Sequence, residues 1–187
     1  IVSYKDMKGL EDYWTTTSQN AGIAGTGHIN NATGDLSFTI GTLSSTDSLM
    51  PYTPTLTYNA AIADYSNIFA NAEVPYKASN AGYGFKWSMS ESIVERTYMG
   101  ENDTEVTYYV WSDADGTEHY FTLCVDASGN TVYKDEDGLQ MTLTSDSSSY
   151  TITDSGKTVR TFTRTSSNIK PGGVLSKITD VSGNYIS

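Results

Sequence analysis

The sequence predicts a mainly β protein whose antiparallel hairpins form a β-sandwich or a stacked, curved sheet, with less than about a tenth of the chain in helix. Short runs rich in β-branched and aromatic residues recur along the second half of the chain. Five Asp/Gly turns separate these runs: DADG, DASGN, DEDG, DSG and DVSGN. The runs HYFTLCV and LQMTLT also alternate apolar with polar residues, as half-buried strands do.

Hairpins are expected to close at three of these turns, Asp113–Gly116, Asp126–Gly129 and Asp135–Gly138. Each Asp side chain can accept hydrogen bonds from its own backbone, and each Gly supplies the positive φ that tight hairpin turns require. Three further runs, SYTIT, TVRTFTRT and VLSKITDV, continue the strands toward the C-terminus. The one plausible helical turn is SMSESIVER, residues 88–96.

The first half of the chain is less regular. The stretch INNATGDLSFTI predicts two strands around a turn at 33–35, and TPTLTYNA predicts another strand. Residues 60–84 form a long polar connection that is expected to pack across a sheet face, because it is too long for a plain loop. We therefore expect one β-rich module: residues 1–60 give the lead-in and first strands, 60–84 the connection, and 85–187 the serial hairpins.

The bulk composition restricts the partners. With 22 acidic and 11 basic residues the net charge is −11, which repels phosphate backbones and anionic membranes, so no nucleic-acid partner is expected. No run approaches the roughly 20 apolar residues of a membrane span, so no membrane insertion is expected. The single cysteine, Cys124, leaves no internal disulfide, and paired Cys and His residues of zinc-site spacing are absent. No cofactor or metal is expected. The chain starts at Ile1 without a signal-like segment, which suggests a piece of a longer polypeptide.

Calcium is the first chemical alternative for the Asp/Gly turns. Asp113, Asp115 and Asp137 could offer carboxylates, but an EF-type loop needs a ladder of ligands that ends in a bidentate Glu. Cys124 stands eleven residues after Asp113, where that Glu would be needed. Turn chemistry is therefore the favoured interpretation, and weak calcium binding between adjacent turns stays open.

Catalytic alternatives have weaker support. A glycosidase-type carboxylate pair could be drawn from Glu95, Glu105, Glu118 and Asp137, but sequence cannot supply the separation that such a pair needs. Nucleophilic catalysis would need Cys124 or a serine beside a histidine. Cys124 is expected in mid-strand, where a thiol is usually packed and slow to react. His119 lies near a turn and His28 in a Gly-rich segment. We therefore predict no catalytic residue.

The three Trp and 14 Tyr suggest a second kind of site. With Asp115 and Gly116 as a two-residue tip, Trp111 would face Tyr120 across the hairpin. One face would then be core, with Tyr108, Val110, Phe121 and Leu123. The other face would carry Tyr109, Trp111, Tyr120 and Thr122. Such an aromatic platform can stack on sugar rings, although packing under another layer is the commoner use of large aromatics.

A rival aromatic group lies in GYGFKWSM, where Tyr83, Phe85 and Trp87 share one face of their strand. These ring faces could also stack on a sugar. Exposure of Trp14, Trp87 and Trp111 distinguishes a sugar-binding role from packing.

The order of several motifs resembles the N-terminal core-entry segment of bacterial Rhs/YD-repeat proteins, in their Gram-positive, gut-bacterial branch. The motifs are NNATGDLSFTI with TPTLTYNA, then GYGFKWSMSESI, YYVWSDADGTEHYF, YKDEDGLQMTLT, YTITDSGKTVRTF and GVLSKITDVSGNYI. Each motif is generic, and their order carries the resemblance, which covers the chain from about Gly9 to Ile186. It implies a secreted or cell-surface bacterial protein whose following repeats build a β-sheet shell. YD units with Gly-aromatic-Asp-Tyr signatures should come next.

Two function hypotheses result. The first is a non-catalytic structural module that enters or caps the shell, with the following repeat domains as its partners. The second is a carbohydrate-binding module that uses an aromatic platform, with a polysaccharide as its partner.

Overall fold

The computed structural model of the protein describes residues 9–11, 14–41, 49–61, 81–82, 84–165 and 172–187. The chain divides into two compact units. The first comprises Ile1–Asp47, Pro51–Glu91 and Ser112–Glu118, and the second comprises Ser48–Met50, Ser92–Trp111 and His119–Ser187. The described residues are mainly strand. Their helical structure is limited to two 3-10 turns, Gly22–Ala24 and Glu101–Asp103, and to Ala60 and Ala61, so the expectation of a mainly β chain is confirmed.

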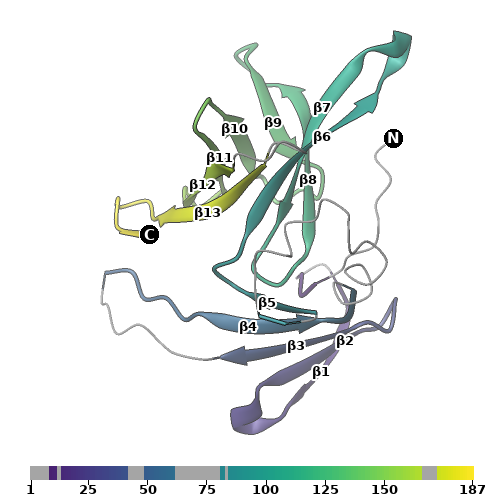
Figure 1. Ribbon diagram of the computed structural model, residues 1–187, viewed down its shortest axis with the longest axis vertical. Coiled ribbons are helices and arrows are strands. Elements are labelled where there is room, and N and C mark those ends of the chain that lie inside the picture. The colour runs from purple at the N-terminus through teal and green to yellow at the C-terminus, as the bar shows by residue number, and fades with distance from the viewer. Residues whose placement is uncertain (1–8, 12–13, 42–48, 62–80, 83, 166–171) are drawn as a thin grey trace. The chain divides into compact units, whose positions relative to one another are not determined.

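The first unit contains one five-stranded antiparallel sheet with the order β1-β2-β3-β4-β5 (Figure 1). Its strands are β1 (Thr16–Asn20), β2 (Thr26–Asn30), β3 (Leu36–Gly41), β4 (Thr55–Asn59) and β5 (Phe85–Trp87). The predicted turn in NNATGD joins β2 to β3, and TPTLTYNA supplies β4, as expected. Most of the predicted connection at 60–84 lies outside the described residues.

The two faces of this sheet differ in chemistry. Lys86 on β5 pairs with Thr57, and Ser37 pairs with Asn59, so these four polar residues share one face, and all four are buried. The opposite face carries apolar and aromatic residues on β3, β4 and β5: Phe38, Ile40, Leu56, Tyr58, Phe85 and Trp87. This alternation is the period-two pattern of a sheet, with the unusual feature that the polar face is the buried one.

The second unit is a closed eight-stranded barrel. Its strands are β6 (Ser92–Met99), β7 (Glu105–Ser112), β8 (Glu118–Val125), β9 (Thr131–Asp135), β10 (Thr142–Ser145), β11 (Ser149–Thr153), β12 (Val159–Thr165) and β13 (Gly172–Thr179). Strands β6 to β12 pair in chain order, and β13 pairs with both β6 and β12, which closes the ring. The short β14 (Tyr185–Ile186) pairs with the end of β13. The finer expectation of a β-sandwich is therefore wrong for this part of the chain, where the sheet closes into a barrel.

Two glycines let the barrel close. A Cβ atom at Gly172 would stand 2.7 Å from the Ile93 carbonyl oxygen, and one at Gly173 would stand 3.0 Å from the Tyr150 ring. Glycine is the residue that allows such a close approach of strand to strand at a barrel corner. The register also shifts between Thr161 and Phe162, which is the kind of bulge that bends a sheet toward closure.

Aromatic and branched side chains form the core of the barrel. The buried cluster consists of Ile93, Tyr109, Trp111, Phe121, Leu143, Tyr150, Ile152 and Phe162. Tyr109 contacts both Tyr133 and Tyr150 edge to face, with ring centroids 4.7 and 5.5 Å apart. Edge-to-face packing is a favourable geometry for aromatic pairs, so these tyrosines help to hold β7, β9 and β11 together.

The segment SMSESIVER does not form a helix. Residues from Ser92 onward belong to the eight-residue strand β6, and Ile93 is fully buried in the barrel. The expected helical turn is wrong because Ile93 and Val94 are β-branched residues whose burial between neighbouring strands outweighs a weak local helical preference.

Candidate functional site

The most unusual group of residues in the first unit surrounds the amine of Lys86. The Lys86 side chain is 2% exposed, and its Nζ donates hydrogen bonds to the Ser112 carbonyl oxygen at 3.1 Å and to Ser112 Oγ at 2.9 Å. It also bonds the Asp113 carbonyl oxygen. A buried ammonium needs such partners, because removing a charge from water without compensation is costly. The amine thus fastens the tip of the β7–β8 hairpin, residues 112–118, to β5 within the first unit.

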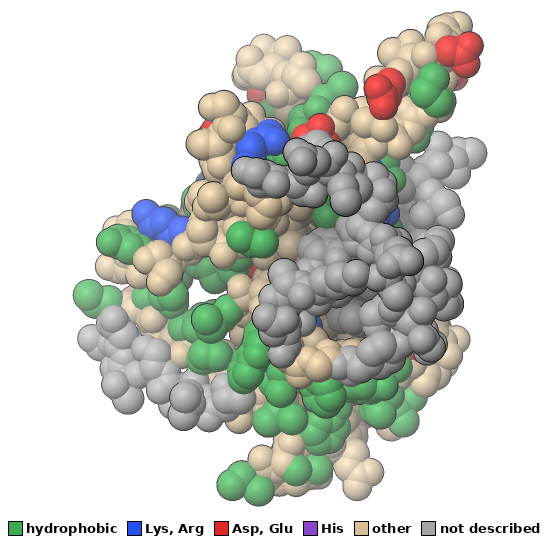
Figure 2. Space-filling view, in the orientation of Figure 1, with side chains coloured by type: hydrophobic (Ala, Val, Ile, Leu, Met, Phe, Trp, Pro, Cys, Tyr) green, Lys and Arg blue, Asp and Glu red, His purple; other side chains and the backbone are tan. Residues whose placement is uncertain are grey.

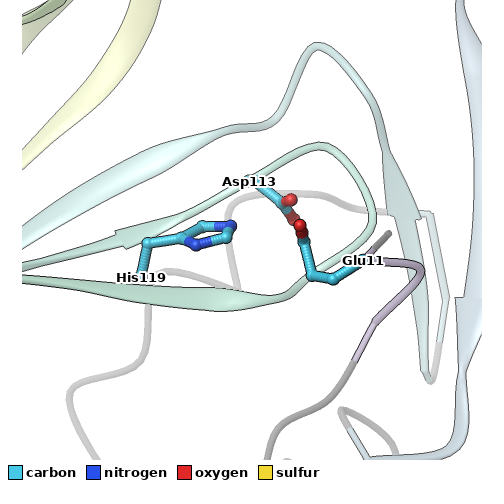
Figure 3. A group of neighbouring side chains, drawn as sticks. All are labelled: Glu11, Asp113 and His119. Atoms are coloured by element: carbon cyan, nitrogen blue, oxygen red, sulfur yellow. The ribbon is translucent and has the colours of Figure 1, made fainter. Parts of the chain in front are cut away.

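Asp113 begins this tip and organises its backbone. Its Oδ1 accepts hydrogen bonds from the backbone N–H groups of Asp115, Gly116 and Thr117, at 3.1, 3.0 and 2.9 Å. A carboxylate oxygen of Glu11, from the N-terminal segment, lies within 4.8 Å of a carboxylate oxygen of Asp113. Figure 3 shows these two carboxylates directed toward one another. The Asp113 Oδ1 atom is thus already bonded to three backbone N–H groups of its own turn.

Asp115 connects the tip to two other segments of the first unit. Its Oδ2 accepts a hydrogen bond from the Leu10 backbone N–H at 2.7 Å, and its Oδ1 accepts bonds from the N–H and hydroxyl of Thr117. The Asp115 carbonyl oxygen accepts a bond from Asn59 Nδ2 at 3.2 Å. Asn59 is completely buried on β4, and its Oδ1 accepts a bond from the Ala61 N–H. These contacts hold the tip against the polar face of the sheet.

The surroundings shift the pKa values of two groups. Burial lowers the pKa of Lys86, although the carboxylates of Asp113, Glu91, Asp115 and Glu118 oppose that change. Burial, together with the charge and a hydrogen bond of the neighbouring Asp113 carboxyl, raises the pKa of Asp115 to about 6. Such perturbed groups occur at functional sites and also in structural ion-pair networks. Here Lys86 and Asp115 hydrogen-bond to the protein's own backbone and side chains, which favours a structural network.

Sequence reasoning missed Lys86 and Asn59. The signal was present: Lys86 alternates with Phe85 and Trp87, so it must point to the opposite face from those rings. Asn59 and Thr57 alternate in the same way with Tyr58 on β4. A single sequence does not reveal that this polar face is the buried one.

The predicted platform of Tyr109, Trp111 and Tyr120 does not form. Tyr109 and Trp111 lie in the barrel core, where Trp111 is 4% exposed, and the Arg160 guanidinium stands 5.4 Å from the Trp111 ring centre. Tyr120 is also buried, but it stacks with Tyr108 rather than with Trp111, at a centroid distance of 6.3 Å. An exposed sugar-stacking surface at these three residues is therefore excluded.

The error came from the length of the turn. The Asp113 N–H bonds the Thr117 carbonyl at 3.0 Å, and the Gly116 N–H bonds the Asp113 carbonyl at 3.3 Å. This is a three-residue loop, in which a β-turn is followed by a glycine with positive φ. Counting outward from the Asp113–Thr117 pair places Trp111 opposite His119. The centroids of the Trp111 and His119 rings are 4.8 Å apart. A two- or four-residue loop would pair Trp111 with residues of the other parity, so an odd loop exchanges the two faces.

The same turn recurs along the barrel. At Asp126 and Asp180 the N–H of the Asp bonds the carbonyl of the Asn four residues later, at 2.9 Å in both turns. Gly129 and Gly183 occupy the positive-φ position, and in the Asp154 turn Lys157 takes this position. The predicted hairpins at Asp113 and Asp126 are confirmed. The hairpin after Asp135 is also present, with a wider loop closed by the Asp135 N–H to the Met141 carbonyl.

Of the predicted core face, Leu123 is the clear exception, because it is 51% exposed. Val110 and Phe121 are buried as expected, although they point to opposite sides of the hairpin. Cys124, expected to be packed, is half-buried between the exposed Leu123 and Val125. The thiol is therefore in a strand as expected but is less packed than expected, because its neighbours at this end of β8 are exposed.

The candidate carboxylates have separate structural roles. Glu95 accepts a long hydrogen bond of 3.5 Å from the Tyr150 hydroxyl, and Asp137 lies 3.2 Å from Nδ1 of the buried His119. Glu105 is exposed at the start of β7, and Glu118 begins β8 at the hairpin tip.

His28, on β2, is half-buried. The Trp residues differ as well, since Trp14 and Trp87 are half-buried whereas Trp111 is buried.

Adding calcium is expected to leave the melting temperature unchanged, because backbone and Asn N–H groups already occupy the carboxylates of the turns. Asp126 Oδ1 accepts bonds of 2.8 Å from the Ser128 and Asn130 N–H groups, and Asp180 has equivalent partners. The hydrogen bond from the Asn130 N–H lowers the pKa of Asp126, and the bond from the Asn184 side chain lowers the pKa of Asp180, with the other N–H bonds adding to both. Differential scanning fluorimetry with calcium and then with chelator checks this. A rise of several degrees that the chelator reverses would contradict it.

Comparisons with protein-family models, curated proteins and solved structures found no match to this chain. Among the described residues no helix is long and apolar enough to cross a membrane.

Proposed function

We propose that this chain is a non-catalytic extracellular module of a secreted or cell-surface bacterial protein, which forms the structural entry or cap of an Rhs/YD-repeat-type shell. Its partners in this proposal are the repeat domains that follow it. The family part of the proposal depends on the order of motifs along the sequence, from NNATGDLSFTI to GVLSKITDVSGNYI.

The observation that carries the structural role is the use made of the chemistry-bearing residues. Tyr109 and Trp111, which were proposed for a ligand, are packed inside a closed barrel, and the turn aspartates bond their own backbones. The buried Lys86 amine likewise donates its hydrogen bonds to the hairpin tip, which it holds in place. An arrangement of this kind supports rigidity rather than turnover of a substrate.

The natural gene, read beyond residue 187, tests the family assignment. We expect it to encode YD units with Gly-aromatic-Asp-Tyr signatures. The present chain and that repeat segment, expressed separately, should then co-elute as a 1:1 complex in size-exclusion chromatography. A natural polypeptide without YD units, or two segments that elute independently, would contradict the proposal.

A second candidate function is carbohydrate binding on the apolar face of the five-stranded sheet. Phe85 and Trp87 lie there beside Tyr58 and Leu56, and the Tyr58 and Phe85 rings are 5.2 Å apart at their centroids. Figure 2 shows hydrophobic side chains gathered where the strands of the first unit lie. All four residues are half-buried, so part of each residue reaches solvent. Tyr83, predicted to join this group, lies outside the described residues.

Replacing Trp87 with alanine is expected to abolish any retardation of the protein in native gels that contain neutral polysaccharides, because sugar rings stack on exposed indole faces. Tyr185→Ala is the matched control, since Tyr185 is an exposed aromatic of the other unit. Equal retardation of the wild type and Trp87→Ala, or mobility of the wild type unaffected by the polysaccharides tested, would retire this second candidate.

A further inference from the structure

Strand β1 forms an edge of the five-stranded sheet and is open along one side (Figure 1). Among the residues that the structure describes, β1 pairs with β2 alone, and Thr17–Asn20 are exposed. An open edge of this kind presents a row of backbone N–H and C=O groups with which another strand can pair.

Alternate residues of β1 direct their backbone groups to this open side. The Thr15 carbonyl accepts a hydrogen bond of 2.9 Å from the Asn31 N–H, and the Ala21 N–H donates one of 2.8 Å to the Gly25 carbonyl. Hydrogen-bonded pairs recur at every second residue of an antiparallel ladder, so the odd-numbered residues of β1 bond to β2. The groups that point away from β2 are therefore the N–H and C=O groups of Thr16, Ser18 and Asn20.

This edge lacks the features with which proteins usually protect a free strand. Charged side chains, proline or a bulge commonly serve that purpose. Residues 14–34, which include both β1 and β2, contain no Asp, Glu, Lys, Arg or Pro. The register between the two strands also runs without a shift from Thr16 to Asn20. In a chain of net charge −11, two copies can thus approach one another along β1 without like charges meeting there.

We propose that two copies of this chain associate through β1, which pairs antiparallel with β1 of the other copy about a two-fold axis at Ser18. The two five-stranded sheets then form one continuous sheet. In this register Ser18 pairs with its counterpart, and Thr16 of each copy pairs with Asn20 of the other. Each pair can exchange both of its N–H···O bonds, so every outward group of the strand is used. A register shifted by two residues leaves some of these groups unpaired.

The side chains of β1 favour a second copy as the occupant of this edge. Across the axis, Ser18 lies beside Ser18, and Thr16 lies beside Asn20. All are uncharged polar residues, so no like charges oppose one another in the cross-strand pairs. Because β1 carries no charge, it offers nothing that would select a strand of opposite charge. The interface is self-complementary, as a two-fold dimer requires, and it does not depend on the proposed function.

Sedimentation equilibrium of the 187-residue chain, from micromolar to millimolar concentration, measures this association. The average mass is expected to rise from the monomer value of 20.3 kDa toward twice that value. Ser18→Pro removes the N–H at the axis but no hydrogen bond to β2, so this variant should stay monomeric. Ser18→Ala is the matched control, because it keeps every backbone group and should associate like the wild type. A wild-type chain that stays monomeric overturns the proposal, and so does undiminished association of a folded Ser18→Pro variant.

A disulfide cross-link tests the register without relying on the proline variant. With Cys124 replaced by serine, Ser18→Cys places two thiols directly opposite one another across the axis. The α-carbons of such a hydrogen-bonded pair are about 5.5 Å apart, which a disulfide can span. Mild oxidation should therefore give a covalent dimer on non-reducing gels.

Gln19→Cys is the control for the cross-link, because residue 19 lies opposite Thr17 of the other copy in this register. Its two thiols belong to different pairs and should cross-link far less. Cross-linking of Gln19→Cys that equals or exceeds that of Ser18→Cys would overturn the two-fold pairing at Ser18.

Discussion

Replacing Trp111 with alanine is expected to lower the free energy of unfolding by about 3 to 5 kcal/mol, the usual cost of truncating a large buried aromatic residue. Trp111 lies in the barrel core, next to the ring of His119 and beneath the Arg160 guanidinium. Its removal leaves a cavity that neighbouring strands of a closed barrel cannot easily fill. Urea denaturation followed by circular dichroism gives the change in midpoint.

Tyr185→Ala provides the control for this experiment, because Tyr185 is 60% exposed on β14. Its loss should change stability by less than about 1 kcal/mol, in the range of exposed substitutions. If Trp111→Ala were as mild as Tyr185→Ala, the indole would have to be exposed, and the sugar platform first predicted at Trp111 would regain support.

Replacing Lys86 with methionine is expected to lower the free energy of unfolding by about 3 to 5 kcal/mol, because the buried hairpin tip loses its charged hydrogen-bond partner. The substitution keeps the volume of the side chain but leaves the carbonyl groups of Ser112 and Asp113 without the amine. It also leaves the nearby carboxylates without a positive charge. Chemical denaturation measures the loss, and hydrogen exchange should place it first at residues 112–118.

Lys134→Met is the matched control, since Lys134 is exposed on β9 and the same side-chain change is made there. Its effect should stay within about 0.5 kcal/mol. Similar losses for the two variants would show that the Lys86 amine is not what holds the hairpin tip.

Much of the secondary structure could be predicted because Asp and Gly residues at fixed positions mark the turns. Asp at the first position and Gly at the fourth gave the hairpins at Asp113 and Asp126 correctly, since the carboxylate and the positive φ are local requirements of the turn. The side of the hairpin on which each residue lies could not be read in the same way. It depends on whether the loop holds an odd or an even number of residues, and DADG is compatible with both.

Closure of the barrel could not be predicted either, because it depends on contacts that the local sequence does not determine. It requires β13 to pair with β6, which lies about 80 residues earlier in the chain and is brought near only by the accumulated curvature of the strands between them. The close approach at Gly172 and Gly173 permits this pairing, but two adjacent glycines are equally typical of a loop. The buried centre around Lys86 was missed because a lysine is seldom fully buried, and its partners are mostly backbone carbonyls, which leave no mark in a sequence.

The cross-strand register of the β7–β8 hairpin tests the central claim most directly, because it decides whether the aromatic residues fill the barrel or face outward. Nuclear Overhauser effects between α-protons of the two strands report which residues are directly opposed. We expect contacts that place Trp111 opposite His119, together with contacts from the Trp111 indole to the His119 ring. Contacts that place Trp111 opposite Tyr120 would contradict the account, because Tyr109 and Trp111 would then leave the barrel core.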